Sequence, residues 1–282
     1  MMETTMKTVN VLVLSGYGLN CDYETCHAFE LAGASASRVH INSLIDGSVT
    51  LADFQVLVFI GGFSWGDDHG AGVIQAVRMG THIGGDLLRF VEKGNLVLGI
   101  CNGFQTLVNL GLLPGFDGSY QTRSVALISN ECGNFRNQWV RLQVNPDSPC
   151  IFTRGIRAAD FPVRHGEGRL HAAEATVTRL EQANQIVLRY ARSDGSAAGG
   201  RFPDNPNGSV ADIAGICDPT GRIFGLMPHP EAHNDWTNHP DWPREREIAR
   251  RAGKPFGAGD TVGIRFFRNA VEYIRSAQTA PR

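Results

Sequence analysis

The sequence predicts an α/β fold with a doubly wound, mostly parallel central sheet, flanking helices and a smaller mixed or antiparallel sheet. Two features of the chain carry this prediction. Through its first half, short apolar runs bounded by glycines alternate with amphipathic stretches, which is typical of strands that feed crossover helices in a parallel sheet. Beyond Gly118 the apolar runs become shorter, which indicates the second sheet.

The first half of the chain supplies the elements of the parallel sheet. Residues 56–60 and 96–100 are apolar runs of the kind found in strands that are buried on both faces. We expect strands over Val9–Leu14, Ser37–Ile41, Val56–Ile60 and Leu96–Ile100, and helices over Tyr23–Ala32 and Gly103–Leu110.

The second half of the chain favours shorter strands and one terminal helix. The turn Asp218-Pro219-Thr220-Gly221 separates two apolar runs and predicts a β-hairpin. We expect strands over Ser124–Ser129, Trp139–Val144, Phe161–His165, Ile186–Tyr190, Ile213–Cys217 and Arg222–Met227, and a helix over Ile264–Ala277.

Two stretches interrupt this pattern and are expected to be surface loops. Residues 193–208 are rich in Gly, Pro, Asn and Ser, and residues 234–260 are rich in Trp, Pro and charge. We expect residues 1–282 to form a single domain that carries both excursions.

Composition narrows the class of protein. The chain has 282 residues, of which 42% are hydrophobic, so it can bury a sizeable core without disulfides. Its six cysteines form no CxxC pair, which indicates a reducing, cytoplasmic compartment. A formal net charge of −2 without a long basic run argues against nucleic acid as a partner. The apolar run near the N-terminus is too short for a signal sequence or a membrane span.

Cys101 is the strongest candidate for a catalytic residue. It lies in the turn GICNG, residues 99–103, between an expected buried strand and an expected helix. This is the sequence pattern of a nucleophile elbow, with cysteine in place of serine. Such a turn exposes the side chain at the carboxyl end of the sheet, beside a helix N-terminus whose partial positive charge favours the thiolate. Most cytosolic cysteines are merely small buried residues, and the elbow pattern is what sets this one apart.

A base and a residue to orient it follow much later in the chain, in Met227-Pro228-His229-Pro230-Glu231. A thiolate nucleophile needs both. In an extended segment, residues two apart point the same way, so His229 and Glu231 can pair side by side. The flanking prolines restrict the backbone and help to hold that geometry. On its own, a His-Pro-Glu motif is more often part of a turn than a catalytic pair. It is a candidate here because the chain also contains an elbow cysteine.

The glycine pair Gly61-Gly62 directly follows an expected buried strand. Such a turn can aim backbone N–H groups at a developing oxyanion. We expect the amide of Gly62 or Phe63 to form a two-donor oxyanion hole with the amide of Asn102. A phosphate-binding loop or a simple strand exit is the alternative, but no P-loop lysine follows.

Together these segments resemble class I glutamine amidotransferases, a family with a Cys, His, Glu triad on a doubly wound, flavodoxin-like α/β domain. Four stretches carry the resemblance: GGFSWGD at 61–67, GICNGFQ at 99–105, HGEGR at 165–169 and MPHPE at 227–231. They are most similar to the glutaminase subunits that pass ammonia to a separate synthetase in purine biosynthesis. The likeness covers most of the chain from Val9 to Glu231.

The resemblance implies a catalytic role for each matching residue. Cys101 would form a γ-glutamyl thioester from glutamine, His229 would shuttle the proton and Glu231 would orient His229. Gln105 matches a position that holds the α-amino acid end of glutamine, and Asn134 and Phe135 match a loop that lines the same pocket.

The resemblance also implies partners and cofactors. It predicts a synthetase subunit that carries ATP and Mg, a small third subunit in many bacteria, and no cofactor in this chain. His165 and Arg169 either line the route toward the synthetase or satisfy a buried turn. Ala232 departs from the basic residue that usually follows the HPE motif, which leaves the details of docking open. His233 and His239 fit no common zinc spacing, so no metal site is expected.

Three other functions remain open on the sequence alone. A class I glutaminase for another acceptor is disfavoured by GGFSWGD and HGEGR. A redox-sensing or deglycating protein of the DJ-1/PfpI type would share the sheet and the elbow cysteine but not the HPE motif. A binding module that has lost turnover is disfavoured by the intact triad.

Overall fold

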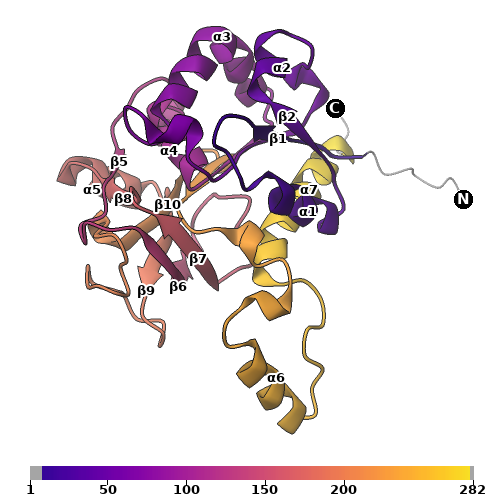
Figure 1. The fold of residues 1–282 in the computed structure, drawn as a ribbon, viewed down its shortest axis with the longest axis vertical. Coiled ribbons are helices and arrows are strands. Elements are labelled where there is room, and N and C mark those ends of the chain that lie inside the picture. The colour runs from indigo at the N-terminus through magenta and orange to yellow at the C-terminus, as the bar shows by residue number, and fades with distance from the viewer. Residues whose placement is uncertain (1–7, 280–282) are drawn as a thin grey trace, which may run out of the picture.

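The computed structural model describes residues 8–279 and confirms the α/β fold class (Figure 1). The strands are β1 (Asn10–Ser15), β2 (Ser35–His40), β3 (Val56–Phe59), β4 (Leu96–Ile100), β5 (Ala126–Ile128), β6 (Arg136–Val144), β7 (Ala158–His165), β8 (Arg169–His171), β9 (Ile186–Ala191), β10 (Ile213–Cys217) and β11 (Ile223–Leu226). The helices are α1 (Asp22–Leu31), α2 (Ile41–Ile45), α3 (Val73–Glu92), α4 (Asn102–Asn109), α5 (Glu174–Gln182), α6 (Trp242–Arg251) and α7 (Val262–Thr279).

A nine-stranded sheet runs through the molecule in the order β2-β1-β3-β4-β11-β10-β9-β6-β7. The strands from β2 to β11 pair in parallel, and β3 and β4 are buried along their whole length. Figure 1 shows α1 beside α7 on one side of these strands and α2, α3 and α4 grouped on the other. Because the strands are parallel, their carboxyl ends meet at one edge, where ligands bind in open α/β sheets.

Four antiparallel strands, β10, β9, β6 and β7, extend the main sheet, while β5 and β8 form a separate two-stranded sheet. The antiparallel strands join the main sheet because of the hairpin between β10 and β11. Asp218 closes its turn, with Oδ1 accepting hydrogen bonds from the N–H groups of Arg222 (3.0 Å) and Ile223 (2.9 Å). The hairpin lays β10 antiparallel against β11 and leaves its other edge open, so β9, β6 and β7 add to the same sheet.

The two excursions differ in structure. Residues 193–208 consist of turns and one isolated bridge between Ala191 and Ala197. Residues 234–260, which the composition predicts to be a loop, contain α6. No residue of α6 is buried, and the helix extends away from the rest of the molecule in Figure 1.

The longest helix within residues 8–279, α3, has no counterpart in the elements expected from the sequence. Its interior holds Gly80, Gly84 and Gly85, and glycine is a poor helix former. The helix forms because an apolar face that includes Met79, Leu87 and Phe90 packs into the core. Across the described part of the chain, no helix is both long enough and apolar enough to cross a membrane.

Candidate active site

Cys101 occupies a strained turn between β4 and α4. Its backbone has φ 52° and ψ −108°, a left-handed conformation that is uncommon for a residue other than glycine. The turn is tight enough that a Cβ on Gly103 would lie 1.9 Å from the carbonyl oxygen of Phe59. The glycine of the motif is therefore required by the packing of α4 against β3.

The Cys101 thiol lies at the carboxyl end of β4, at the N-terminus of α4. Its side chain is 5% exposed, and Sγ lies 3.6 Å from the carbonyl oxygen of Arg164. The first N–H groups of a helix have no partner within the helix, and their partial positive charge favours a thiolate at this position. The expected elbow is thus present at the expected strand and helix.

His229 and Glu231 form a buried pair just after β11. Nδ1 of His229 lies 2.5 Å from Oε1 of Glu231, and the two side chains are 2% and 0% exposed. The backbone N–H of His229 donates to the carbonyl oxygen of Pro162 at 2.9 Å, which fixes the segment against β7. Gly61 leaves room for the ring, because a Cβ there would lie 2.7 Å from Cε1 of His229.

The hydrogen bond to Glu231 assigns the proton of the neutral ring to Nδ1 and leaves Nε2 as the base. Burial lowers the pKa of His229, but the charge of Glu231 and the interaction with the Cys101 thiol outweigh it and hold the pKa well above its usual range. Nε2 has no hydrogen-bond partner within residues 8–279. The raised pKa favours the imidazolium, so Glu231 orients the ring through Nδ1 while Nε2 carries the proton that pairs the ring with a Cys101 thiolate.

The candidate oxyanion donors are not equally available. The N–H of Phe63 donates to the carbonyl oxygen of Gly18 at 2.9 Å, so it is already used. The N–H of Gly62 makes no hydrogen bond to another described residue, and that of Asn102 belongs to the first turn of α4, where helices leave donors free. Of the two alternatives, the geometry favours Gly62 as the partner of Asn102.

These groups surround one cavity of about 220 Å³. A cavity of this size suits a small molecule such as an amino acid, and its wall includes one acidic and one basic residue, Glu24 and Arg164. The lining residues are Asn20, Cys21, Glu24, Gly62, Phe63, Cys101, Phe135, Asn137, Arg164 and His229.

Gln105 lies one helical turn after the nucleophile. Its side chain is 4% exposed; Nε2 donates to the carbonyl oxygen of Glu167, and Oε1 accepts from Nδ2 of Asn102 at 3.3 Å. Asp67 also accepts from Nδ2 of Asn102, at 3.1 Å. Burial, followed by the charge of Glu167, raises the pKa of Asp67 to about 6. Gln105 is thus part of a polar network beside the elbow.

Asn134 and Phe135 lie at the exposed side of the site. Phe135 is 50% exposed, lines the cavity and packs against Phe63 with ring centroids 6.1 Å apart. Asn134 does not belong to the cavity wall, and its carbonyl oxygen accepts from Nδ2 of Asn130 at 2.9 Å.

His165 and Arg169 flank a buried turn. His165 is 3% exposed, and its Nδ1 lies 3.0 Å from Oδ1 of Asn130, which also accepts from the N–H of Gly168. Burial, followed by the neighbouring charge of His229, lowers the pKa of His165 to about 3, so the ring is neutral. Arg169 begins β8 and pairs with Ile128 of β5. Asn130 engages Nδ1 of His165, but the buried Nε2 has no hydrogen-bond partner among residues 8–279, so both alternatives for His165 stay open.

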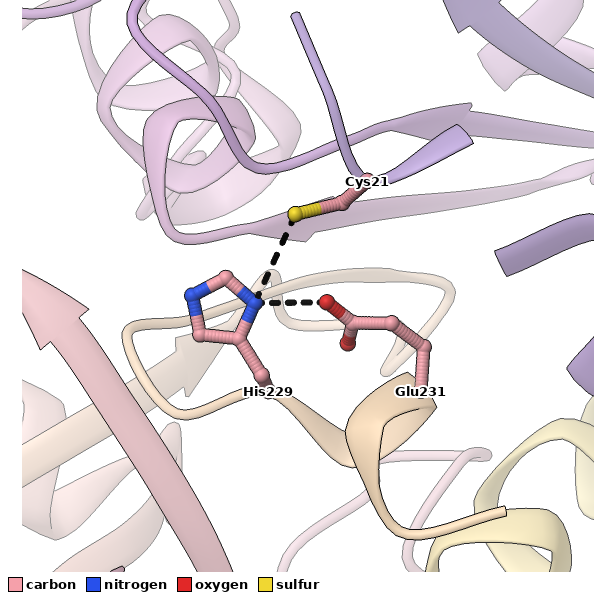
Figure 2. A group of neighbouring side chains, drawn as sticks. All are labelled: Cys21, His229 and Glu231. Atoms are coloured by element: carbon pink, nitrogen blue, oxygen red, sulfur yellow. Dashed lines mark hydrogen bonds and ion pairs between the residues drawn. The ribbon is translucent and has the colours of Figure 1, made fainter. Parts of the chain in front are cut away.

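Two residues near the site were not singled out in the sequence. Asn130 uses both ends of its buried amide to tie the 129–135 loop to the 165–168 turn. Cys21 lies at the start of α1 with Sγ 4.0 Å from Nδ1 of His229 (Figure 2). The predicted parallel sheet could have pointed to Cys21. In such a sheet, the loop after the first strand lies at the same edge as the turn that carries Cys101.

Comparison with known proteins agrees with this geometry. The family model of the CobB/CobQ-like glutamine amidotransferase domain matches residues 8–274. A Methanococcus maripaludis protein named phosphoribosylformylglycinamidine synthase subunit PurQ is 48% identical, covering 94% of this chain and 97% of its own. A Dehalococcoides mccartyi protein of the same name is 43% identical, covering 96% and 99%.

A solved structure agrees as well. A chain in the structure of PurLQS from Thermotoga maritima superposes with a TM-score of 0.67 and 28% identity, covering 95% of this chain and 100% of that one. The chain therefore belongs to the CobB/CobQ-like glutamine amidotransferase family and, within it, to the PurQ group.

Proposed function

We propose that this protein is the glutaminase subunit of a phosphoribosylformylglycinamidine synthase, with Cys101, His229 and Glu231 as its catalytic triad. It would hydrolyse glutamine to glutamate and ammonia. The observation that carries the proposal is the buried His229–Glu231 pair, which leaves Nε2 of His229 without a hydrogen-bond partner among residues 8–279, in a residue that lines the same cavity as Cys101.

The first half-reaction forms a thioester. The thiolate of Cys101 attacks the side-chain carbonyl carbon of glutamine, and the resulting oxyanion accepts hydrogen bonds from the amides of Gly62 and Asn102. When the tetrahedral intermediate collapses, the C–N bond breaks and Nε2 of His229 donates its proton to the departing nitrogen. Ammonia leaves, and the γ-glutamyl group remains on Cys101.

The second half-reaction restores the enzyme. Water attacks the thioester carbonyl while Nε2 of His229, now neutral, accepts a proton from it. The C–S bond then breaks, glutamate leaves and the Cys101 thiolate is recovered beside the His229 imidazolium. Glu231 keeps the same hydrogen bond to Nδ1 throughout and stabilises the ring whenever it is charged.

The substrate is held by the residues around the cavity. We assign the α-amino acid end of glutamine to the segment of Asn134 and Phe135, of which Phe135 lines the cavity, and to Gln105, which lies outside the cavity wall in the polar network beside it. Glu24 and Arg164 line the same cavity and give it one charge of each sign, which suits the zwitterion of an amino acid.

The ammonia is proposed to pass to a PurL-type synthetase subunit that carries ATP and Mg and makes formylglycinamidine ribonucleotide in purine biosynthesis. A small PurS-type subunit would complete the assembly. The supporting observations are the relatives named PurQ and the match to a chain in PurLQS. We place the enzyme in the cytoplasm, in keeping with six free cysteines.

The test is glutamate release from glutamine by the purified chain, measured with and without the synthetase and its nucleotide substrate. We expect release to rise in the complex, because a glutaminase that runs uncoupled wastes glutamine and such sites are often completed by docking. Cys101→Ala abolishes release, whereas Cys26→Ala, which alters a buried thiol outside the cavity, leaves it intact. Release that survives Cys101→Ala would overturn the assignment of the nucleophile, and equal turnover with and without the partner would overturn the coupling.

A further inference from the structure

Cys21 has no part in the triad, yet its thiol faces the catalytic base. It precedes α1, in the segment that follows the carboxyl end of β1, and its side chain is 5% exposed. Sγ lies 4.0 Å from Nδ1 of His229, on the same ring nitrogen that Glu231 contacts (Figure 2). The thiol, the imidazole and the carboxylate therefore converge on one point.

The carboxylate in this group is incompletely satisfied. Glu231 is 0% exposed, and its Oε2 has no hydrogen-bond partner among residues 8–279. A buried carboxylate oxygen without a partner is costly, and such groups are usually paired or bound to a metal. The site thus has unused capacity to bind a cation.

We propose that Cys21, His229 and Glu231 form a zinc site that reversibly switches the enzyme off. Thiolate, imidazole and carboxylate are the three ligand types that zinc prefers. The ligand atoms of the three residues lie within 4.8 Å of one another. With zinc–ligand bonds of about 2.0–2.3 Å in a tetrahedron, ligand atoms stand roughly 3.3–3.7 Å apart.

The geometry requires only small shifts. Sγ of Cys21 and Nδ1 of His229 must approach by a few tenths of an ångström from 4.0 Å, and Glu231 must move back from Nδ1 by about 1 Å. Cys21 and His229 line the cavity, so zinc can enter where the substrate does. The fourth position is left for water.

The bound state is compatible with this buried setting in both charge and protons. The Zn–S bond replaces the S–H bond of Cys21, the Zn–N bond replaces the N–H bond at Nδ1 of the His229 imidazolium, and both protons leave to solvent. The metal takes the lone pair of Nδ1, so a neutral His229 carries its proton on Nε2. Zn²⁺ with one thiolate, one carboxylate and a neutral imidazole has no net charge, so zinc leaves the buried group neutral overall, as the His229–Glu231 ion pair does without it.

Zinc would inhibit the enzyme because it occupies one nitrogen of the His229 ring and fixes the proton on the other. With zinc on Nδ1 and a proton on Nε2, His229 can neither accept the proton of Cys101 nor keep its contact with Glu231. Inhibition therefore rests on the proposed function, whereas zinc binding does not.

The experiment measures zinc affinity of the full chain by competition with a chromophoric chelator. Variants are compared in a Cys101→Ala background, which removes the competing active-site thiol. We expect this parent to bind one zinc ion. Cys21→Ser should weaken binding by more than about 100-fold, since even loss of an outer-shell partner costs about 10–100-fold. Cys26→Ser, a matched change in another buried thiol of the same region, should have no effect.

A second measurement identifies the ligand. Cobalt(II) bound to the Cys101→Ala parent should give a thiolate charge-transfer band that Cys21→Ser lacks, with thermal unfolding confirming that both variants are folded. Two results would overturn the proposal. One is that the Cys101→Ala parent does not bind zinc, because any zinc bound by the wild type then needs Cys101. The other is that Cys21→Ser in this background retains the zinc affinity and the charge-transfer band of the parent. In the wild type, zinc should stop glutamate release and a chelator should restore it. If zinc binds but does not change a measurable rate of glutamate release, the inhibitory role is overturned and the zinc site itself stands.

Discussion

Three contacts fix the orientation of His229. Glu231 engages Nδ1, Gly61 leaves space beside Cε1, and the backbone N–H is bonded to Pro162. Each contact comes from a different part of the chain, and together they leave Nε2 as the free nitrogen. At the scale of single residues, the orientation of this ring governs both the proposed catalysis and the proposed inhibition.

Replacing Glu231 with glutamine should lower kcat for glutamate release by about 10²–10⁴-fold, because an amide cannot stabilise the imidazolium or enforce the proton on Nδ1. Steady-state kinetics in the presence of the synthetase would measure the loss. Glu30→Gln, which changes an exposed carboxylate of α1, serves as the control. A Glu231→Gln enzyme with unchanged kcat would remove Glu231 from the triad.

His165 should make the protein less stable in acid. Its folded pKa is about 3 because it is buried, whereas an unfolded histidine titrates near 6.5, so only the unfolded state takes up a proton between these values. No stability is lost well above pH 6.5, the loss grows as the pH falls toward 3, and it reaches about 2 kcal/mol at pH 5.

Urea unfolding of wild type and His165→Gln at pH 5 and pH 7.5 would measure this loss of stability in acid. We expect the free energy of unfolding to depend less on pH in the variant, while His27→Gln, a change at an exposed histidine, keeps the wild-type dependence. Parallel pH curves for His165→Gln and wild type would show that His165 is not the titrating group.

At the scale of elements, the site depends on how closely α4 follows β4. The parallel pairing of β1, β3 and β4 brings their carboxyl ends together, and with them Cys21, Gly62 and Cys101. The elbow holds Cys101 in its strained conformation only because the first turn of α4 packs directly on β3.

Gly103→Ala should therefore destabilise the protein by about 3 kcal/mol or more, because the added Cβ would meet the Phe59 carbonyl oxygen at 1.9 Å. Gly84→Ala offers a matched control within α3, where a Cβ meets nothing within 4 Å. That change should stabilise by about 0.5–1 kcal/mol through higher helix propensity. Chemical denaturation compares the two, and similar stabilities would contradict the packing argument.

At the scale of the whole molecule, α6 stands apart from the core. None of its residues is buried, and its ion pairs from Glu247 to Arg250 and Arg251 are on the surface, where such pairs contribute little. In contrast, α7 follows the excursion and buries Phe266 and Phe267 in the core. Local opening of α6 should be easy while the flanking segments stay folded.

Brief trypsin digestion should accordingly cut first within α6, which contains four arginines. The comparison site is Arg89 of α3, which is exposed but lies on a helix packed into the core. The nicked chain should elute as one species in size-exclusion chromatography, because both fragments share the sheet and its helices. Early cleavage at Arg89, or fragments that separate, would contradict this view of the excursion.

Prediction from the sequence succeeded where the signal is local. Buried strands such as Leu96–Ile100 are continuous apolar runs, and the elbow and the HPE motif lie in short segments with their own chemistry. Prediction failed for α3, because its glycines are poor helix formers and tertiary packing stabilises the helix. It also failed for α6, because the composition of that segment suggested a loop.

The sequence by itself determined the α/β class, the parallel strands and the identity of the candidate nucleophile, base and orienting carboxylate, because each depends on residue type and short spacing. Only the tertiary structure decided that the N–H of Phe63 is already bonded, that His165 is a buried neutral ring, and that Cys21 faces His229. These facts join residues far apart in the chain, and such distances are set by how the strands pair and the helices pack.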